Sequence, residues 1–158
     1  MQYCIHFHKI LLNLTTENDV ILRISFAGEC NFQNNTYLKK AVEEYWKGNI
    51  SMLKYKLPAP YAKFEAVFKK VQEIPFGKVS SYGSIAKAVF GNKKYARLIG
   101  TAMKNNPLLI IIPCHRVIRS NGNIGGFSGG VDIKIKLLKL EGVELKNGYI
   151  KKEYFANF

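Results

Sequence analysis

Residues 81–105 read SYGSIAKAVFGNKKYARLIGTAMKN, and this stretch decides the fold of the larger part of the chain. Ser81 is a preferred N-cap residue, and apolar residues recur at helical spacing as far as Gly91, so we expect a helix over 82–90. A second helix is predicted from about Tyr95 to Asn105. Two short helices joined by a tight turn that contains glycine indicate a helix-turn-helix.

The second of these helices carries two cations among small residues. Arg97 and Lys104 lie near Ala96 and Gly100. Glycine inside a helix costs about 1 kcal/mol relative to alanine, so the absence of a side chain at Gly100 needs a reason. Close packing against another helix and close approach to a DNA groove are both adequate reasons, and this segment alone does not decide between them.

Toward the N-terminus, the residue pattern becomes typical of β-strands. Residues 2–8 are rich in β-branched and aromatic types, and residues 10–14 and 20–26 are predicted as strands around a polar turn at 17–19. Residues 36–47 have helical periodicity that ends at Gly48. The prolines of residues 57–60 interrupt any regular element. We therefore predict an α+β fold, with a small N-terminal α/β domain (1–57) that contains an antiparallel sheet, followed by a mainly helical domain (58–158).

The rest of the second domain is also predicted from its pattern. A helix is expected over 61–72, and a buried extended run over 108–112. A glycine-rich loop follows over 122–130. Asp132 is the expected N-cap of a last helix that ends near Glu141, with Leu140 facing the core, and the lysine-rich tail from Leu145 is expected to fray.

Charge is distributed unevenly along the 158 residues. Residues 1–57 carry 7 basic and 5 acidic side chains (7 − 5 = +2), whereas residues 58–158 carry 17 basic and 6 acidic ones (17 − 6 = +11). A chain that is merely rich in lysine would be basic throughout. A field of one sign over one half of the chain indicates a polyanionic partner, and we expect nucleic acid rather than a membrane.

Composition excludes several other classes of protein. At 47% hydrophobic and 22% charged residues, the chain is too apolar for disorder, and its longest apolar run is far shorter than the roughly 18 residues of a membrane helix. Nothing at the start of the chain marks it for export. Three cysteines cannot form a disulfide framework, so we expect a cytoplasmic protein in which each thiol must be explained singly.

The candidate nucleophile is Cys114, which follows Pro113 and precedes His115. Only the thiolate reacts, and a free cysteine titrates near pH ~8.5, so a reactive cysteine needs help. His115 can take the proton through a water molecule, and Arg116 and Arg119 add positive charge. A lone cysteine is more often a buried, inert residue, but Pro113 forces the chain to turn at the thiol.

The run Ile112-Pro113-Cys114-His115-Arg116-Val117 resembles the active-site motif of the O6-alkylguanine-DNA alkyltransferases, also called methylated-DNA–protein-cysteine methyltransferases. The resemblance covers most of residues 61–145, and its further motifs lie, in the family's order and spacing, at residues 74–79, 81–82, 96–97, 100, 102–103, 105–107, 128–130 and 140–142. The first 57 residues match the family only in general shape.

The resemblance implies a reaction and a role for each matching residue. A family member flips an alkylated guanine out of duplex DNA and transfers the alkyl group to its own cysteine, here Cys114, and O4-alkylthymine is a poorer substrate. His115 would accept the thiol proton through water, and Glu141 would orient His115. Tyr82 would rotate the nucleotide and donate a proton to N3 of the base. Asn106 would tie the recognition helix to the active-site turn, and Arg116 is expected to be structural.

The resemblance also implies how DNA is held. The helix-turn-helix would enter the narrow minor groove, where the small residues Ala96 and Gly100 permit close approach, and Lys104 would contact DNA. Arg97 matches the family's arginine finger, which fills the gap left by the flipped base. Without the resemblance, Arg97 would be read as a plain phosphate contact, Tyr82 as a core aromatic residue and Glu141 as a solvated charge.

The base pocket would be formed by Cys114 and Val117, whose carbonyls accept from the exocyclic amine of guanine, and by the loop residues Phe127 and Ser128. A tyrosine is usual where this chain has Phe127, so the aromatic wall is kept and the hydroxyl is lost. The resemblance implies a monomer that needs no cofactor and ends permanently alkylated. A zinc site at Cys4, His6, His8 and Cys30 fits no standard spacing, so we expect no metal, and a Cys4–Cys30 disulfide is left open.

Three other functions compete with this hypothesis. An alkyltransferase-like protein binds lesions without transfer but replaces the cysteine, which this chain keeps. A helix-turn-helix regulator needs polar base-reading residues on its second helix, and the sequence supplies few. A Cys-His hydrolase would turn over many times and ignore DNA.

Overall fold

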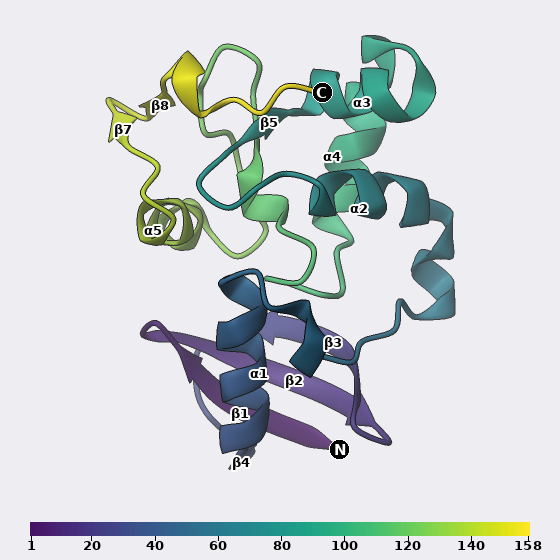
Figure 1. The fold of residues 1–158 in the computed structure, drawn as a ribbon, viewed down its shortest axis with the longest axis vertical. Helices are drawn as coiled ribbons and strands as arrows, with labels where there is room; N and C mark the ends of the chain where they lie inside the picture. Colours follow the sequence, from purple (N-terminus) through teal and green to yellow (C-terminus); the bar gives the residue numbers. More distant parts are fainter. The chain divides into compact units, whose positions relative to one another are not determined.

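A computed structural model describes all 158 residues, and the chain divides into two compact units (Figure 1). Unit 1 consists of Met1–Lys63 with Pro107–Ile111, and unit 2 of Phe64–Asn106 with Ile112–Phe158. The main sheet and the helices occupy separate parts of the sequence, so the predicted α+β class is confirmed. The division into two domains with a boundary after residue 57 stays a prediction. None of the helices is long and apolar enough to cross a bilayer.

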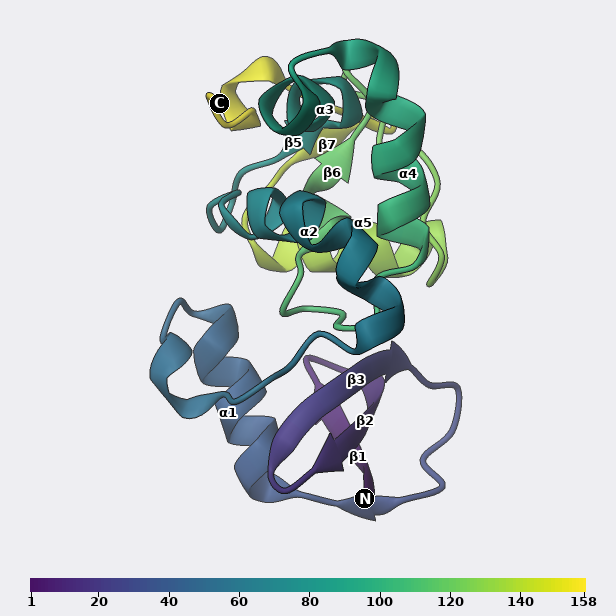
Figure 2. The same cartoon turned by 90° about the vertical axis from the view of Figure 1, so that its right-hand side faces the viewer.

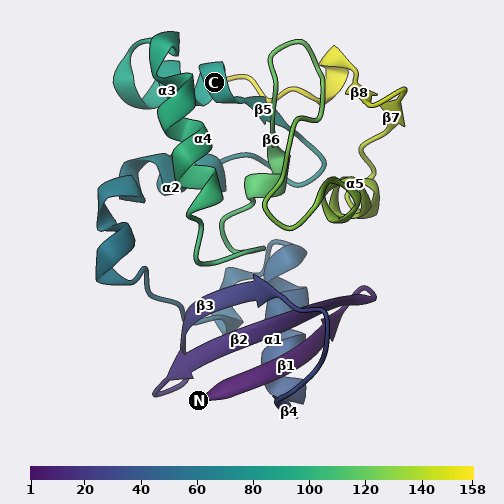
Figure 3. The same cartoon turned by 180° about the vertical axis from the view of Figure 1, so that it is seen from behind.

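Unit 1 is a sheet with one helix against it. Strands β1 (Gln2–Phe7), β2 (Ile10–Glu17) and β3 (Val20–Phe26) pair antiparallel in the order β3-β2-β1, and β4 (Gln33–Asn34), which was not predicted, pairs parallel to β1. Helix α1 (Thr36–Trp46) lies against this sheet, as Figures 1 and 3 show from opposite sides. The Phe7 ring meets Trp46 edge-on at 5.1 Å between ring centroids, which fixes the helix to the apolar face of the sheet.

Two of the three cysteines are used in unit 1. Cys4 of β1 and Cys30, which follows β3, form a disulfide. This disulfide settles the pairing that the sequence left open. The two residues that could have supplied sulfur ligands to the zinc site considered above are therefore bonded to each other. Of the two remaining candidates, His6 and His8 are both exposed.

The connection into unit 2 starts with a tight helix. A 3₁₀ helix, η2 (Ala59–Phe64), precedes α2 (Glu65–Gln72), so the α-helix starts four residues later than predicted. Pro60 lies in the first turn of η2, where the missing N–H of proline has no intrahelical partner to lose. The predicted apolar face is confirmed, since Phe64, Val67 and Val71 are buried. A further 3₁₀ turn, η1 (Ile50–Met52), lies within unit 1.

The two helices that were predicted with most detail are present. Helix α3 (Tyr82–Phe90) is capped by the Ser81 hydroxyl, which accepts from the Ser84 N–H at 3.0 Å, and Gly91 ends it with φ +74°. A short 3₁₀ turn, η3 (Lys93–Tyr95), leads directly into α4 (Ala96–Lys104). Figure 2 shows α2, α3 and α4 packed together. Both predicted helices are confirmed to within one residue at each end.

Behind these helices lies a small parallel ladder that follows the motif of residues 112–117. Strand β5 (Ser80–Ser81) pairs with β6 (Val117–Ile118), and β6 follows the 3₁₀ turn η4 (Cys114–Arg116). The run 108–112 is buried as expected, but it is not extended throughout, since Ile110 has φ +72°. A left-handed conformation is rare at a β-branched residue, and here it interrupts the extended run before the motif begins at Ile112.

The last helix and the tail correct three expectations. Helix α5 (Val131–Leu140) starts after Gly130, and Asp132 lies in its first turn instead of capping it. Leu140 is 39% exposed, whereas Lys134 is fully buried. The tail forms the hairpin β7 (Leu145–Lys146) and β8 (Tyr149–Ile150) and the turn η5 (Lys152–Tyr154). It does not fray, because the backbone of Val79 exchanges hydrogen bonds with residues 154 and 156.

Candidate functional site

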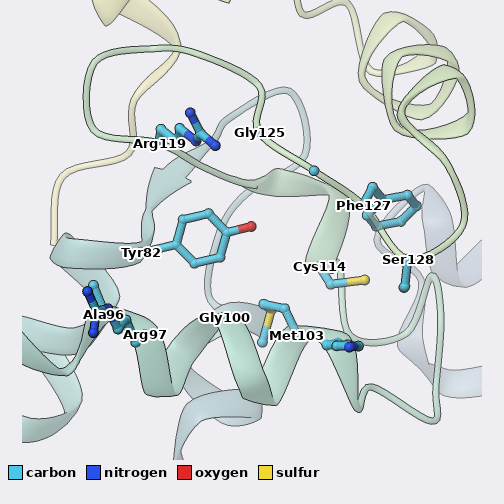
Figure 4. Close-up of a pocket in the computed structure, with 12 residues that line it drawn as sticks. Tyr82, Ala96, Arg97, Gly100, Met103, Cys114, Arg119, Gly125, Phe127 and Ser128 are labelled. Carbon is cyan, nitrogen blue, oxygen red and sulfur yellow. The ribbon is translucent and has the colours of Figure 1, made fainter.

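The candidate site is a cavity of about 580 Å³ within unit 2 (Figure 4). This volume is in the range of pockets that hold small organic groups. Five separate segments build its wall: the start of α3, one face of α4, the turn η4, Arg119 after β6 and the glycine-rich loop. The lining residues are Tyr82, Ala96, Arg97, Gly100, Met103, Lys104, Cys114, Arg119, Gly125, Gly126, Phe127 and Ser128.

Pro113 sets the position of the thiol. Its backbone (φ −79°, ψ 63°) forms an inverse γ-turn, in which the Cys114 N–H donates to the Ile112 carbonyl at 2.7 Å. The chain then enters η4, and the Cys114 sulfur lies between Met103 of α4 and the loop residues Phe127 and Ser128 (Figure 4). The expectation that Pro113 turns the chain at the thiol is confirmed.

The surroundings of Cys114 favour the protonated form of its thiol. Its residue surface is only 3% exposed, and burial raises the pKa of the thiol. A hydrogen bond from Asn106, the charge of Lys134 and backbone N–H groups oppose this rise. The resting site therefore holds a neutral thiol, and its activation requires a base.

A buried carboxylate organises the residues behind the thiol. Glu141 Oε1 lies 2.8 Å from His115 Nε2, and Arg116 donates to both carboxylate oxygens at 2.9–3.0 Å. The Gly77 N–H also donates to Glu141, at 3.1 Å, and Arg116 donates to the Ile74 carbonyl at 2.7 Å. A Cβ on Gly77 (φ +73°) would crowd the Glu141 carbonyl oxygen at 3.1 Å and strain the backbone, which favours glycine here.

This arrangement fixes the state of the imidazole. Burial lowers the pKa of His115, and the hydrogen bond and charge of Glu141 oppose the shift without reversing it. Burial raises the pKa of Glu141, but its contacts with His115 and Arg116 outweigh this and lower the pKa overall, so it stays a carboxylate. A neutral His115 must then donate from Nε2 to Glu141, which leaves Nδ1 as an unprotonated acceptor.

Tyr82 is the first residue of α3, and its hydroxyl points into the cavity (Figure 4). Burial raises the pKa of this phenol, the charge of Cys114 raises it further, and the charge of Arg119 opposes both. The phenol therefore keeps its proton at neutral pH and is available as a donor.

Helix α4 presents a smooth surface beside the cavity. A Cβ placed on Gly100 would find no atom within 4 Å, so close packing against another helix does not explain this glycine. The sequence left two explanations open for Gly100, close packing against another helix and close approach to a DNA groove. Only approach by an external partner remains. Arg97 and Lys104 are exposed on the same helix and line the cavity.

The predicted residues fall into two groups. Eight of them line the cavity together, namely Tyr82, Ala96, Arg97, Gly100, Lys104, Cys114, Phe127 and Ser128. The other four lie behind its wall: His115, Glu141, Asn106 and Val117. Asn106 joins the end of α4 to the turn, since its Nδ2 donates to the Ile112 carbonyl at 2.8 Å. Val117 is fully buried, and its carbonyl accepts a hydrogen bond from Lys134 at 2.7 Å.

Lys134 is the residue that sequence reasoning missed. The sequence analysis assigned it no role, but it precedes the buried Leu137 and Leu138 by three and four residues. That spacing places it on the apolar face of the helix, which is the signal that could have found it. Met103 and Arg119 also line the cavity without having been assigned to it.

Comparisons with known proteins agree with this geometry. The family model described as "6-O-methylguanine DNA methyltransferase, DNA binding domain" matches residues 62–143, more than half of the chain. A methylated-DNA–protein-cysteine methyltransferase of Methanosarcina acetivorans is 41% identical over 70% of this chain and 72% of its own length. One of the same name from Metallosphaera sedula is 35% identical over 89% of this chain and 92% of its own.

A solved structure extends the similarity to the fold. The chain superposes on Mycobacterium tuberculosis OGT, crystallised in complex with DNA, with a TM-score of 0.74 and 28% identity over 89% of this chain and 91% of that one. The match includes the sheet unit, where the sequence resemblance was only general. From the family model, the relatives and the shared fold, the chain belongs to the 6-O-methylguanine DNA methyltransferase family.

Proposed function

We propose that this protein repairs DNA by removing the alkyl group of O6-alkylguanine, and less readily that of O4-alkylthymine, and transferring it to Cys114. The observation that carries the proposal is a thiol, outside any disulfide, on the wall of a cavity bounded on one side by α4 with its exposed cations. Relatives that bear the name methylated-DNA–protein-cysteine methyltransferase support the reaction type.

The base must leave the duplex to reach the sulfur. Extruding a nucleotide costs a few kcal/mol, and we propose that α3 and α4 act as a helix-turn-helix that offsets this cost by binding the minor groove. Ala96 and Gly100 let the helix approach the groove, and Lys104 adds attraction to phosphates. Arg97 occupies the vacated position in the stack, where its planar guanidinium can stack and donate to the orphaned base.

The transfer is an in-line displacement at the alkyl carbon. The thiol proton of Cys114 passes through a water molecule to Nδ1 of His115, and the resulting imidazolium is stabilised by Glu141. The Sγ–C bond forms as the C–O6 bond breaks, and the bonding pair stays on the guanine oxygen. Tyr82 donates its proton to N3, so guanine leaves as a neutral molecule, and solvent returns the proton of His115 to the phenolate.

The glycine-rich loop and the turn η4, with the strand that follows it, recognise the guanine base. Ser128 can donate to O6, and the carbonyls of Cys114 and Val117 can accept from the exocyclic amine. The Val117 carbonyl already accepts from Lys134, and its second lone pair is available to the base. Phe127 supplies an aromatic wall without the hydroxyl that is usual in the family.

We further propose that the protein acts once, as a cytoplasmic monomer, without a cofactor. The DNA itself is the alkyl donor, and the thioether that forms is chemically stable. An alkyltransferase-like protein that only binds lesions is disfavoured because Cys114 is present and lines the cavity.

Intact-protein mass spectrometry tests the proposal. After incubation with a duplex oligonucleotide that carries O6-methylguanine, the protein should gain a single methyl group in stoichiometric amount, and Cys114→Ser should gain none. Removal of many methyl groups per protein molecule would contradict single turnover, and removal by Cys114→Ser would contradict the nucleophile. Tight lesion binding without any mass change would indicate a protein that only binds lesions.

A further inference from the structure

The side chain of Arg119 lies at the cavity, and the mechanism above assigns it no step. Arg119 follows β6, is exposed, and lines the cavity that contains Cys114. Its guanidinium makes no hydrogen bond and no ion pair, whereas Arg116, three residues earlier, is paired with Glu141. An unpaired cation at the rim of a reactive site therefore needs an explanation other than stability.

The backbone and one glycine place Arg119 at this rim. Its N–H donates to the Asn123 carbonyl at 3.0 Å, and its carbonyl accepts from the Gly122 N–H at 3.0 Å, so a tight loop closes at Arg119. Its side chain lies against Gly125, where an added Cβ would be 3.7 Å from Cγ and 3.8 Å from Nε. The stem of the side chain is thus held in place, while the guanidinium stays accessible.

A second hollow, of about 510 Å³, lies on the other side of Arg119. The two hollows share Tyr82, Ala96 and Arg119, which together form the partition between them. Ala96 ends at its Cβ, so the polar side-chain atoms of this partition are those of Tyr82 and Arg119, and Figure 4 shows these two side chains on the same side of the cavity. No acidic side chain lines either hollow, so no carboxylate there neutralises Arg119.

The proposed transfer ionises Tyr82 in an unfavourable place. As the C–O6 bond breaks, its electron pair passes to the purine. The phenolic O–H bond breaks and an N–H bond forms at N3, so the phenolate keeps the pair of the O–H bond. Burial raises the pKa of the Tyr82 phenol and the charge of Cys114 raises it further, whereas the charge of Arg119 lowers it. An unpaired positive charge at Arg119 therefore favours the phenolate that the reaction must form.

We propose that Arg119 is a positioning residue for proton transfer, whose guanidinium pairs with the Tyr82 oxygen and balances the phenolate that forms when the phenol protonates N3 of the leaving guanine. The catalytic part rests on the proposed function, whereas the interaction between the two side chains does not require DNA. The charged and titratable groups that face Tyr82 across the two hollows are Lys93 on η3, Arg97 and Lys104 on α4, Cys114 on η4 and Arg119 after β6.

The interaction is measured first without DNA. Difluorotyrosine incorporated at position 82 gives a single fluorine resonance and ionises at a pH that the fold tolerates. We expect Arg119→Gln to raise the midpoint of this resonance by about half a pH unit, because an opposite charge is removed. Arg23→Gln, which removes an exposed arginine of β3, is the matched control and should leave the midpoint unchanged. An unchanged midpoint in Arg119→Gln would overturn the proposal.

The catalytic part is measured by single-turnover transfer, with the protein in saturating excess over the duplex. Arg119→Gln should transfer from O6-methylguanine about tenfold more slowly than the wild type, because the bound base excludes water and strengthens the charge interaction. In 3-deaza-O6-methylguanine a C–H group replaces N3 and no proton is taken up, so the two proteins should transfer from it at equal rates. A loss of the same size with both substrates would show that Arg119 contacts a DNA phosphate instead, and would overturn the proposal.

A second background separates this role from a general loss of activity. Tyr82→Phe has no phenol to ionise, so Arg119→Gln should cause no additional loss in it, and additive losses would refute the coupling. Arg119→Lys keeps the charge and should transfer faster than Arg119→Gln; equal rates would contradict a role of charge. If the wild type transfers no methyl group, the proposed function and the catalytic role of Arg119 both fail, while the fluorine midpoints still decide whether Arg119 acts on the phenol.

Discussion

His115 Nε2 lies 2.8 Å from Oε1 of Glu141, and both side chains are almost wholly buried. The same carboxylate accepts two further groups, the Arg116 guanidinium and the Gly77 N–H. One carboxylate thus orients the proposed base and also holds the turn that carries the nucleophile. Chemistry and stability are coupled at Glu141, and its removal should affect both.

Replacement of Glu141 by glutamine should therefore lower stability and transfer together. Breaking a buried ion pair leaves Arg116 uncompensated, which costs about 3–5 kcal/mol. Transfer in single-turnover assays should fall by more than tenfold, since Nδ1 of His115 loses its fixed orientation. Thermal unfolding followed by circular dichroism gives the stability, and Glu73→Gln is the matched control.

Glu73 pairs with Lys70 at the surface, so its replacement should change stability by less than about 1 kcal/mol. A Glu141→Gln protein as stable as this control would show that the buried network does not hold the turn.

Stability should decline in mild acid because of His115. Its pKa in the folded protein is lowered by burial, so between the unfolded value of about 6.5 and the folded value only the unfolded chain binds the proton. The stabilisation is complete above pH ~6.5 and is lost as the pH falls toward the folded pKa, with a slope of at most about 1.4 kcal/mol per pH unit.

Urea unfolding between pH 5 and pH 7.5 measures this slope. The His115→Asn variant lacks the titrating group, so the difference in unfolding free energy between it and the wild type isolates His115. A difference that does not vary with pH would mean that His115 titrates alike in the folded and unfolded chains, and a difference that changes in the opposite direction would mean that the folded protein holds the proton more tightly.

The elements that sequence predicted well are those whose signals are local. Ser81 caps α3 and Gly91 ends it, and both act within one turn of the helix. The strand predicted over 10–14 is also present, but β2 continues three residues further, to Glu17 at the start of the predicted polar turn. The errors at Asp132 and Leu140 have a tertiary cause: α5 is rotated so that Lys134 reaches three carbonyls of distant segments, and helical periodicity alone contains no information on those acceptors.

The spacing of residues along the sequence could not predict which of them line the site. Its lining comes from segments near residues 82, 100, 114 and 127, which only the fold brings together. The resemblance to the alkyltransferases named most of these residues, because it carries the information of an already folded relative. It did not name Lys134, whose partners are backbone carbonyls and therefore leave no mark in side-chain identities.

Gly100→Ala separates stability from DNA binding. The added methyl group meets no atom within 4 Å, and alanine favours the helix, so the protein should become more stable by up to about 1 kcal/mol. If α4 enters the minor groove, the same methyl group should weaken duplex binding severalfold. Thermal unfolding and fluorescence anisotropy with a labelled duplex measure the two effects. Stabilisation with unchanged binding would place Gly100 outside the interface.

Arg97→Ala should impair repair more than binding. Arg97 is exposed at the edge of the cavity, so its loss removes one cation from a strongly basic surface and weakens binding of undamaged duplex only modestly. If its guanidinium fills the gap left by the extruded base, the transfer rate from O6-methylguanine in duplex DNA should fall by about tenfold or more.

Transfer from a free O6-benzylguanine base, which needs no extrusion, should be almost unchanged in Arg97→Ala. Lys139→Ala, an exposed cation on α5 away from the lining, is the matched control and should leave both rates as they are. An equal loss with the free base and the duplex would place Arg97 in the chemistry of the pocket, and no loss with either would reduce it to a surface charge.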